Sequence, residues 1–295
     1  MNTKFDNNSV DFAIQNFLLS RESMGCTEGT MRNYVFNLKK FKEYLEKNGI
    51  EKIKDIKSSD IRGYLAEMAE RGASDSYRHG HARTIRTLML FCVEDKLIDI
   101  YPKFEMPKIH KTELTVLSVD EVKEIIDSCI SFRDKVIILF CVDTGLRLSE
   151  LVSLKWGDLN FKSGLLKVTG KGKKFRIVPT SASLRRQLLK YRSQLENNSD
   201  IDYIFQTKNN YRLSKWGLTS TFARIDDRSR IDFSAHALRR TFAKLSVKSG
   251  NDIVFIQNTM GHENIETTRH YIQALDEDDI IDNHKEHSVM ENFFK

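Results

Sequence analysis

Apolar residues in the first hundred positions recur three or four residues apart, which is the period of an amphipathic helix. The helical pattern starts near Ser9 and is clearest in one set: Met31, Tyr34, Val35, Leu38, Phe41 and Leu45. Another helix is expected to follow Ser58 and to end at Gly72, and a further one to run from about Asp75 to Lys96. These patterns predict an all-α N-terminal bundle.

The pattern changes after this bundle. Positions 101–115 contain two of the chain's three prolines and no periodic apolar residues, which is typical of an interdomain linker. Ser118 and Glu121 then have the spacing of a capping box, so a helix is expected to begin there. A helix of core-forming residues should follow over about 134–143.

The second domain also contains a predicted sheet. Short runs of β-prone residues at 158–161, 165–168 and 175–178 are separated by turn sequences that contain glycine. Helical patterns return beyond Pro179, at about 183–195, 214–225, 236–249, 252–260 and 264–273. The predicted fold class is therefore mainly α with a small antiparallel β-sheet (α+β) in the second domain.

Charge is unevenly distributed along the chain, whose net charge is +6. Residues 1–110 carry +2, residues 111–271 carry +9 and residues 272–295 carry −5. A basic central block suits a domain that neutralises phosphates, although solvated surface charge is the commoner origin of such a balance. The polar side of the predicted helix at 75–96 offers several cations, which we interpret as facing a DNA backbone: Arg78, His79, His81, Arg83 and Arg86.

The composition disfavours several classes of protein. No apolar run approaches the roughly 20 residues that span a bilayer, and the N-terminus lacks the layout of a signal peptide. The four cysteines (Cys26, Cys92, Cys129 and Cys141) form no C-x-x-C pair. We therefore expect reduced thiols in a cytoplasmic protein, without disulfides, a metal site, a cofactor or a membrane partner.

The second domain contains residues that could cleave a DNA phosphodiester without a metal. That reaction needs cations or hydrogen-bond donors around the phosphate, a nucleophile, and a proton donor for the leaving oxygen. Candidates occur in order along the domain: Arg147, Glu150, Lys171, His236, Arg239, His262 and Tyr271. Each alone has an ordinary structural explanation, such as a surface ion pair or a packed helix residue, but their joint occurrence favours a catalytic site.

The chain resembles the tyrosine recombinase (phage integrase) family, especially its simple Xer-type members. The motifs that carry the resemblance are T-G-L-R-x-S-E-L at 144–151, H-x-L-R at 236–239 and G-H-x-x-x-x-T-T-x-x-Y at 261–271, with a weaker G-K-G-K-K at 170–174. The resemblance implies two domains that form a C-shaped clamp around DNA. The implied boundaries are a core-binding domain at 1–108, a linker at 109–117, a catalytic domain at 118–273 and an acidic tail at 274–295.

The resemblance also implies roles for the matching residues. Tyr271 would form a 3′-phosphotyrosine, and Arg147, Arg239 and His262 would hold the non-bridging oxygens. His236 would lie beside the phosphate as a donor or proton partner, and Glu150 would orient the cations. Lys171 would protonate the leaving oxygen, although Lys173 and Lys174 lie in the same turn and are expected at least to contact DNA.

The implied activity is site-specific recombination through a Holliday junction, with double-stranded DNA carrying inverted-repeat core sites as substrate. The implied assembly is a dimer on one site and a tetramer in the synapse, with a possible accessory or partner recombinase. The alternatives are a type IB topoisomerase or hairpin-forming resolvase, and an inactive DNA-binding regulator. Because the helical pattern begins near Ser9, we expect no additional module ahead of the core-binding helices. The acidic tail, with Phe293 and Phe294, is expected to dock on a neighbouring protomer.

Overall fold

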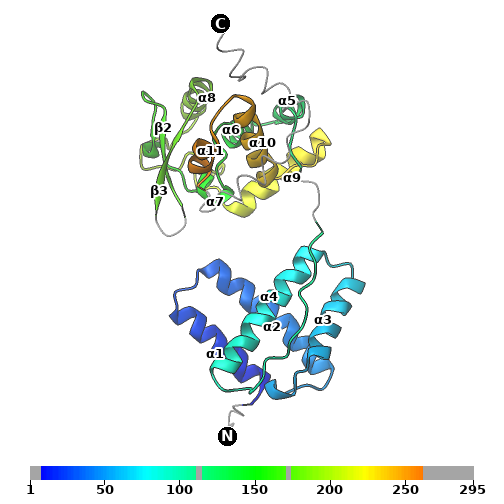
Figure 1. Ribbon diagram of the computed structural model, residues 1–295. Helices are drawn as coiled ribbons and strands as arrows, with labels where there is room; N and C mark the ends of the chain where they lie inside the picture. The colour runs from blue at the N-terminus through cyan, green and yellow to red at the C-terminus, as the bar shows by residue number, and fades with distance from the viewer. Residues whose placement is uncertain (1–7, 111–114, 171–173, 262–295) are drawn as a thin grey trace, which may run out of the picture. The chain divides into compact units, whose positions relative to one another are not determined.

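The structure, a computed structural model, describes residues 8–110, 115–170 and 174–261 (Figure 1). The chain divides into two compact units, Met1–Thr112 and Glu113–Lys295, and each unit has its own hydrophobic core. Helices predominate in both, and the second also holds a small antiparallel sheet. This confirms the predicted fold class. No helix in the described part of the chain is long and apolar enough to cross a membrane.

The first unit is a bundle of helices: α1 (Val10–Ser23), α2 (Glu28–Lys47), α3 (Ser58–Glu70) and α4 (Asp75–Glu94), with a 3-10 turn, η1 (Ile53–Asp55), before α3. Hydroxyl side chains of Ser9, Thr27 and Ser74 cap α1, α2 and α4 by accepting a backbone N–H from the first turn. The apolar helix faces enclose a core that includes Phe17, Leu38, Phe41, Ile61, Ile85 and Met89.

Two residues of this unit lie differently from the prediction. Val35 is 49% exposed, because it lies beside the buried stripe of α2. His81 does not face solvent with the cations of α4 but is 1% exposed, and its Nδ1 lies 2.9 Å from the hydroxyl of Tyr64. The Nε2 of this ring is buried without a hydrogen-bond partner among the described residues, and burial lowers the pKa of His81, which favours the neutral ring. Arg83 and Arg86 do face solvent.

Helices also predominate in the described part of the second unit. They are α5 (Val119–Asp127), α6 (Phe132–Thr144), α7 (Leu148–Leu151), α8 (Ala182–Arg192), α9 (Lys215–Ser229), α10 (Ala235–Lys248) and α11 (Ile253–Met260). The predicted capping box is present at α5, where Ser118 and Glu121 bond each other's backbone N–H. α5, α8 and α10 pack against α6, whose Val136, Ile137 and Ile138 are fully buried.

The sheet of this unit consists of β1 (Leu159–Asn160), β2 (Leu165–Thr169) and β3 (Phe175–Pro179), in that order and antiparallel, and a 3-10 turn, η2 (Trp156–Asp158), precedes it. In the β2–β3 hairpin Val168 pairs with Arg176, and Leu166 pairs with Val178. Since side chains alternate along a strand, Arg176 and the fully buried Val178 belong to the same face of β3. The predicted strands are confirmed, and β1 is shorter than expected.

The last described helix, α11, has a small apolar cluster of its own with α10. This cluster consists of Phe242, Ala243, Ile256 and Met260 and is separate from the main core of the unit. α11 also contacts β3 and ends at Gly261, whose φ of 65° is left-handed. The helix predicted over 264–273 lies outside the described residues.

Candidate active site

Arg147 is placed by a sharp turn between two helices. Gly145 ends α6 with a φ of 59°, and a Cβ at this position would overlap the ring of Phe242, so the turn requires glycine. Arg147 is then the N-cap of α7. Its Nη1 donates to Glu150 Oε1 at 3.1 Å, and its Nη2 donates to the carbonyl of Gly261 at 2.7 Å. The side chain remains 39% exposed, so an anion can approach it.

Glu150 is a buried carboxylate between two guanidinium groups. Its side chain is 4% exposed and accepts hydrogen bonds from Arg147 and from both terminal nitrogens of Arg176, at 2.8 and 2.9 Å. Burial raises the pKa of Glu150, but the hydrogen bonds and charges of Arg176 and Arg147 outweigh it and hold the pKa below its ordinary value. Glu150 is therefore ionised at neutral pH and anchors both cations.

Arg239 is held from two sides. It lies on α10 and is 2% exposed. Its Nη1 donates to the carbonyl of Gly145, and its Nη2 donates to the carbonyl of Met260 at 2.7 Å. These bonds join the turn that precedes Arg147 to the end of α11. A fixed guanidinium with little access to water exerts a stronger field than a solvated one.

The end of α11 is the point where these arginines meet. Three consecutive carbonyls there, of Thr259, Met260 and Gly261, accept hydrogen bonds from Arg176, Arg239 and Arg147 respectively, each at 2.7 Å. The last carbonyls of a helix have no partner inside the helix and carry partial negative charge, so cations are favourable there. The three guanidinium groups thereby share one anchor.

Arg176 was not predicted from the sequence. It lies in β3 at a position facing Val168 of β2, and its side chain is 15% exposed. The available signal was its place in the strand: Val178, two residues on, belongs to the buried face, and an arginine on that face needs a buried partner. That partner is Glu150, which comes from a different segment of the chain, so spacing alone could not identify it.

His236 lies in the first turn of α10, one helical turn before Arg239. The residue is exposed, yet partial burial of its ring and the positive charges of Arg239, Arg240 and Arg147 lower its pKa. The ring is thus neutral at neutral pH and can either donate or accept a proton. Arg240 points elsewhere, since its Nε donates to the carbonyl of Thr115.

The structure thus brings together Arg147, Glu150, His236 and Arg239 of the predicted set. Four other predicted residues, Lys171, Lys173, His262 and Tyr271, lie outside the described residues. Lys174 is described and exposed. The tentative DNA-contacting residues of α4 belong to the first unit; Arg83 and Arg86 are exposed, whereas Arg78 forms an ion pair with Asp75.

The arrangement suits a polyanionic group rather than a metal ion. Two fixed guanidinium groups and a neutral imidazole can surround an anion with several oxygens, such as a phosphate. Within residues 8–110, 115–170 and 174–261, no group of three or more His, Cys, Asp or Glu side chains is arranged to hold a metal ion.

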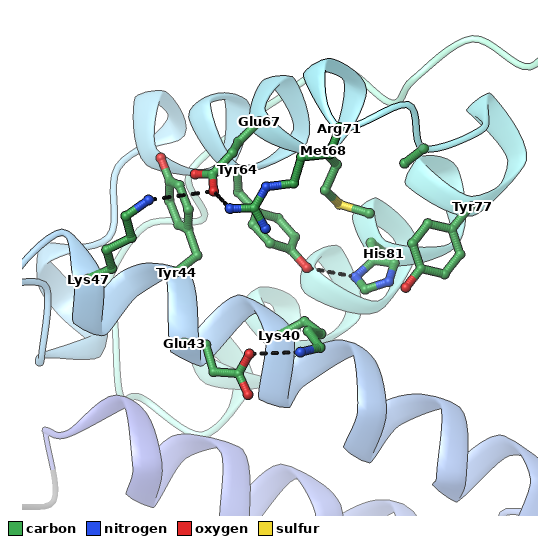
Figure 2. A pocket seen from close by; sticks show the side chains of 11 residues that line it. Lys40, Glu43, Tyr44, Lys47, Tyr64, Glu67, Met68, Arg71, Tyr77 and His81 are labelled. Atoms are coloured by element: carbon green, nitrogen blue, oxygen red, sulfur yellow. Dashed lines mark hydrogen bonds and ion pairs between the residues drawn. The ribbon is translucent and has the colours of Figure 1, made fainter.

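A separate cavity of about 350 Å³ lies in the first unit (Figure 2). Its walls include Tyr44, Tyr64, Met68, Tyr77 and His81. Figure 2 shows that the charged side chains at its rim pair with one another, Lys40 with Glu43, and Glu67 with both Lys47 and Arg71. None of the predicted catalytic residues lines it.

Two family models match the chain. The model described as "Phage integrase family" matches residues 115–278, and the model described as "Phage integrase, N-terminal SAM-like domain" matches residues 15–91. The first match covers more than half of the chain and includes all the predicted catalytic positions.

Curated relatives match nearly the whole chain. Tyrosine recombinase XerA of Pyrococcus horikoshii is 30% identical over 268 residues, which is 88% of this chain and 88% of the relative. Tyrosine recombinase XerD of Oceanobacillus iheyensis is 28% identical over 277 residues, covering 89% of this chain and 93% of the relative.

Solved structures share the fold at lower identity. A lambda integrase (75-356) dimer bound to a COC′ core site matches with a TM-score of 0.77 and 20% identity, covering 88% of this chain and 97% of that one. The Tn1549 transposon integrase in complex with a circular intermediate DNA matches with a TM-score of 0.74 and 17% identity, covering 93% and 99%.

Proposed function

Because the chain belongs to the phage integrase family and is a site-specific DNA recombinase of the tyrosine type, we propose specific roles for its residues at the scissile phosphate. Tyr271 attacks the phosphorus, and Arg147 and Arg239 hold the non-bridging oxygens. Glu150 orients Arg147 through its carboxylate. His236 and His262 supply further hydrogen bonds to the phosphate or its proton partners.

One observation carries this proposal, the anchoring of Arg147 and Arg239 on adjacent carbonyls at the end of α11. Negative charge grows on the non-bridging oxygens as the phosphorus is attacked, so donors fixed in advance lower the barrier most. A guanidinium can bind two oxygens of a phosphate with parallel hydrogen bonds. Both arginines are held by backbone carbonyls, which keeps them in place before DNA arrives.

The proposed cleavage step is balanced without a cofactor. The Tyr271 oxygen forms a bond to phosphorus, the bond from phosphorus to the 5′ oxygen breaks, and the 3′ end stays attached to the protein. The tyrosine proton passes to a base beside the phosphate, for which the neutral His236 is suited. Lys171 gives a proton to the departing 5′ oxygen. Attack by a 5′-hydroxyl on the phosphotyrosine reverses these steps and joins the strands.

The assembly that we propose follows from the relatives. Lambda integrase has been solved as a dimer on a core site and as a tetramer on a Holliday junction. By analogy, this chain would bind inverted-repeat core sites as a dimer and exchange strands as a tetramer. Residues 1–108 would be the core-binding domain and residues 118–273 the catalytic domain. DNA as substrate would place its activity in the cytoplasm.

Covalent trapping tests the proposal. Duplexes taken from the DNA that flanks the gene, nicked next to the expected cleavage position, lose the fragment needed for rejoining and should accumulate a protein–DNA adduct through the 3′ phosphate. The Tyr271→Phe variant should bind the same duplex and form no adduct. An adduct that persists in Tyr271→Phe would contradict the assignment. Relaxation of plasmid without a target site and without recombinant product would instead favour a type IB topoisomerase.

A further inference from the structure

Arg176 makes hydrogen bonds to two parts of the site that come from different segments. Its Nη1 and Nη2 donate to the two oxygens of Glu150, and its Nε donates to the carbonyl of Thr259 at 2.7 Å. The first partner lies in α7 and the second in the last turn of α11. The guanidinium therefore links β3 to both elements that hold Arg147.

We propose that Arg176 is a positioning residue of the recombination reaction, fixing Glu150 and the end of α11 so that Arg147 is held in a defined geometry before DNA binds. The inference rests on the proposed function, since it concerns the orientation of the same phosphate-binding groups. Arg176 need not touch DNA in this role. It acts through Glu150 and through the backbone at Thr259.

The backbone around Arg176 is built to admit a guanidinium group. A Cβ added at Gly261 would lie 2.9 Å from Arg176 Cζ, and one at Gly170 would lie 3.8 Å from Arg176 Nη1. Glycine at position 261 leaves room for the side chain, whereas a Cβ at position 170 would make only ordinary van der Waals contact with it. Gly170 also directly precedes Lys171 in the sequence, so the base of the β2–β3 hairpin lies beside the Arg176–Glu150 pair.

Stability alone does not require an arginine here. Arg176 lies on the same face of β3 as the fully buried Val178, and it forms a largely buried ion pair with Glu150. Buried ion pairs are frequently no more stabilising than well-packed apolar side chains, because both charges lose their hydration. The hydrogen bonds of Arg176 indicate a different role. Its three donor nitrogens lie in one plane and fix the positions of β3, α7 and the end of α11 relative to one another.

The test compares cleavage rate with DNA affinity and stability in three variants, using the nicked suicide duplex as substrate. Arg176→Met should lower the rate of adduct formation about 10- to 100-fold, the effect expected when catalytic groups are displaced by about an ångström. Its DNA affinity at fixed salt should stay within about threefold. Arg176→Lys should fold like the wild type and still be slow, because one ammonium cannot bind Glu150 bidentately and also reach Thr259.

Arg133 offers a matched control. It pairs with the buried carboxylate of Asp134 and donates to the carbonyl of Gln206, so it combines the same two kinds of bond away from the site. Arg133→Met should lose stability to a similar degree and keep the wild-type adduct rate per folded molecule. An equal loss of rate in both methionine variants would overturn the proposal, because the effect would then follow stability.

The pH profile gives a readout that a purely structural role would not move. Among the described residues, the charged groups facing Glu150 are Arg147 of its own helix and Arg176 of β3. Without Arg176 the pKa of the buried Glu150 rises, so the carboxylate is protonated, and Arg147 released, at a higher pH. As the pH is lowered below neutrality, the adduct rate of Arg176→Met should therefore begin to decline at a higher pH than the wild-type rate.

A double substitution completes the test. If Arg176 acts through Glu150, Arg176→Met and Glu150→Gln should be strongly non-additive, with the double variant scarcely slower than the slower single variant. Wild-type rates in Arg176→Lys and Arg176→Met, or an unshifted pH profile, would overturn the proposal. Failure of the wild-type protein to form any adduct would instead count against the proposed function.

Discussion

Arg147 and Gly261 are 114 residues apart in the sequence and are joined by a hydrogen bond of 2.7 Å from the guanidinium to the carbonyl. Gly261 ends α11 in a left-handed conformation and directly precedes His262. The bond therefore ties one predicted phosphate-binding arginine to the point in the chain where the motif containing Tyr271 begins. A change at either end of this bond should alter cleavage.

Gly261→Ala should damage the site more than the fold. The left-handed φ costs a non-glycine residue about 1–2 kcal/mol, and the new methyl group would meet the guanidinium of Arg176. We expect the free energy of unfolding, measured with urea, to fall by at least this amount and the adduct rate per folded molecule to fall about tenfold or more.

Gly72→Ala is the control for backbone strain alone. Gly72 has a similar φ of 78°, and a Cβ there would have nothing within 4 Å. In this variant the free energy of unfolding should fall by a comparable amount, because the backbone strain is similar. It should cleave at the wild-type rate. Equal cleavage by both alanine variants would show that the contact between Gly261 and Arg176 is unimportant for catalysis.

Lys171→Ala should slow cleavage of an ordinary phosphodiester about 10²- to 10⁴-fold, the range for loss of a general acid. A duplex with sulfur in place of the 5′ bridging oxygen should restore most of the rate, because a thiolate leaves without a proton. Lys173→Ala and Lys174→Ala should have small effects on both duplexes. Full rescue of Lys173→Ala or Lys174→Ala by sulfur, with none for Lys171→Ala, would move the role to that neighbour.

Arg83 and Arg86 are expected to bind phosphates of the DNA backbone. Replacing both with alanine should weaken binding to a core-site duplex and reduce the slope of log K against log salt by about 0.9 for each phosphate that is no longer neutralised. Arg78→Ala should change the slope less, because Arg78 is already paired with Asp75. A salt titration of binding by fluorescence anisotropy measures all three. An unchanged slope in the double variant would remove α4 from the DNA interface.

Truncation after Gln273 tests the proposed docking of the acidic tail. The shortened protein should bind one core site with wild-type affinity, since the tail carries negative charge and would neutralise no phosphate. Pairing of two sites should be weakened, because the segment proposed to dock on a neighbouring protomer is missing. Native gels with one and two sites distinguish these steps, and normal pairing by the truncated protein would refute the docking model.

Local sequence signals predicted most of the fold. The capping box at Ser118 and the β-prone runs around the glycine turns depend on neighbouring residues, so spacing was enough to find them. The pair of Arg147 and Glu150 is local in the same way, since the two residues lie within one helical turn. His81 shows the limit, because its burial depends on Tyr64 from another helix.

Arg176 was missed for the same physical reason. Its two partners lie 26 and 83 residues away, and only the packing of β3 against α7 and α11 brings them together. The sequence shows that an arginine stands on the buried face of a predicted strand. It does not show which residues that arginine bonds to. Sequence motifs were therefore enough to predict the residues expected to act on DNA. They were not enough to predict Arg176, which we propose positions those residues.

The small apolar cluster under α11 has a consequence for how the enzyme responds to heat. Ile256 and Met260 of α11 pack against Phe242 and Ala243 of α10, apart from the main core, and yet the carbonyls at the end of α11 anchor three arginines. Local opening of this helix would release all three anchors together while the rest of the unit stays folded. We therefore expect activity to be lost on warming in one cooperative step, at a temperature below that at which the whole unit melts.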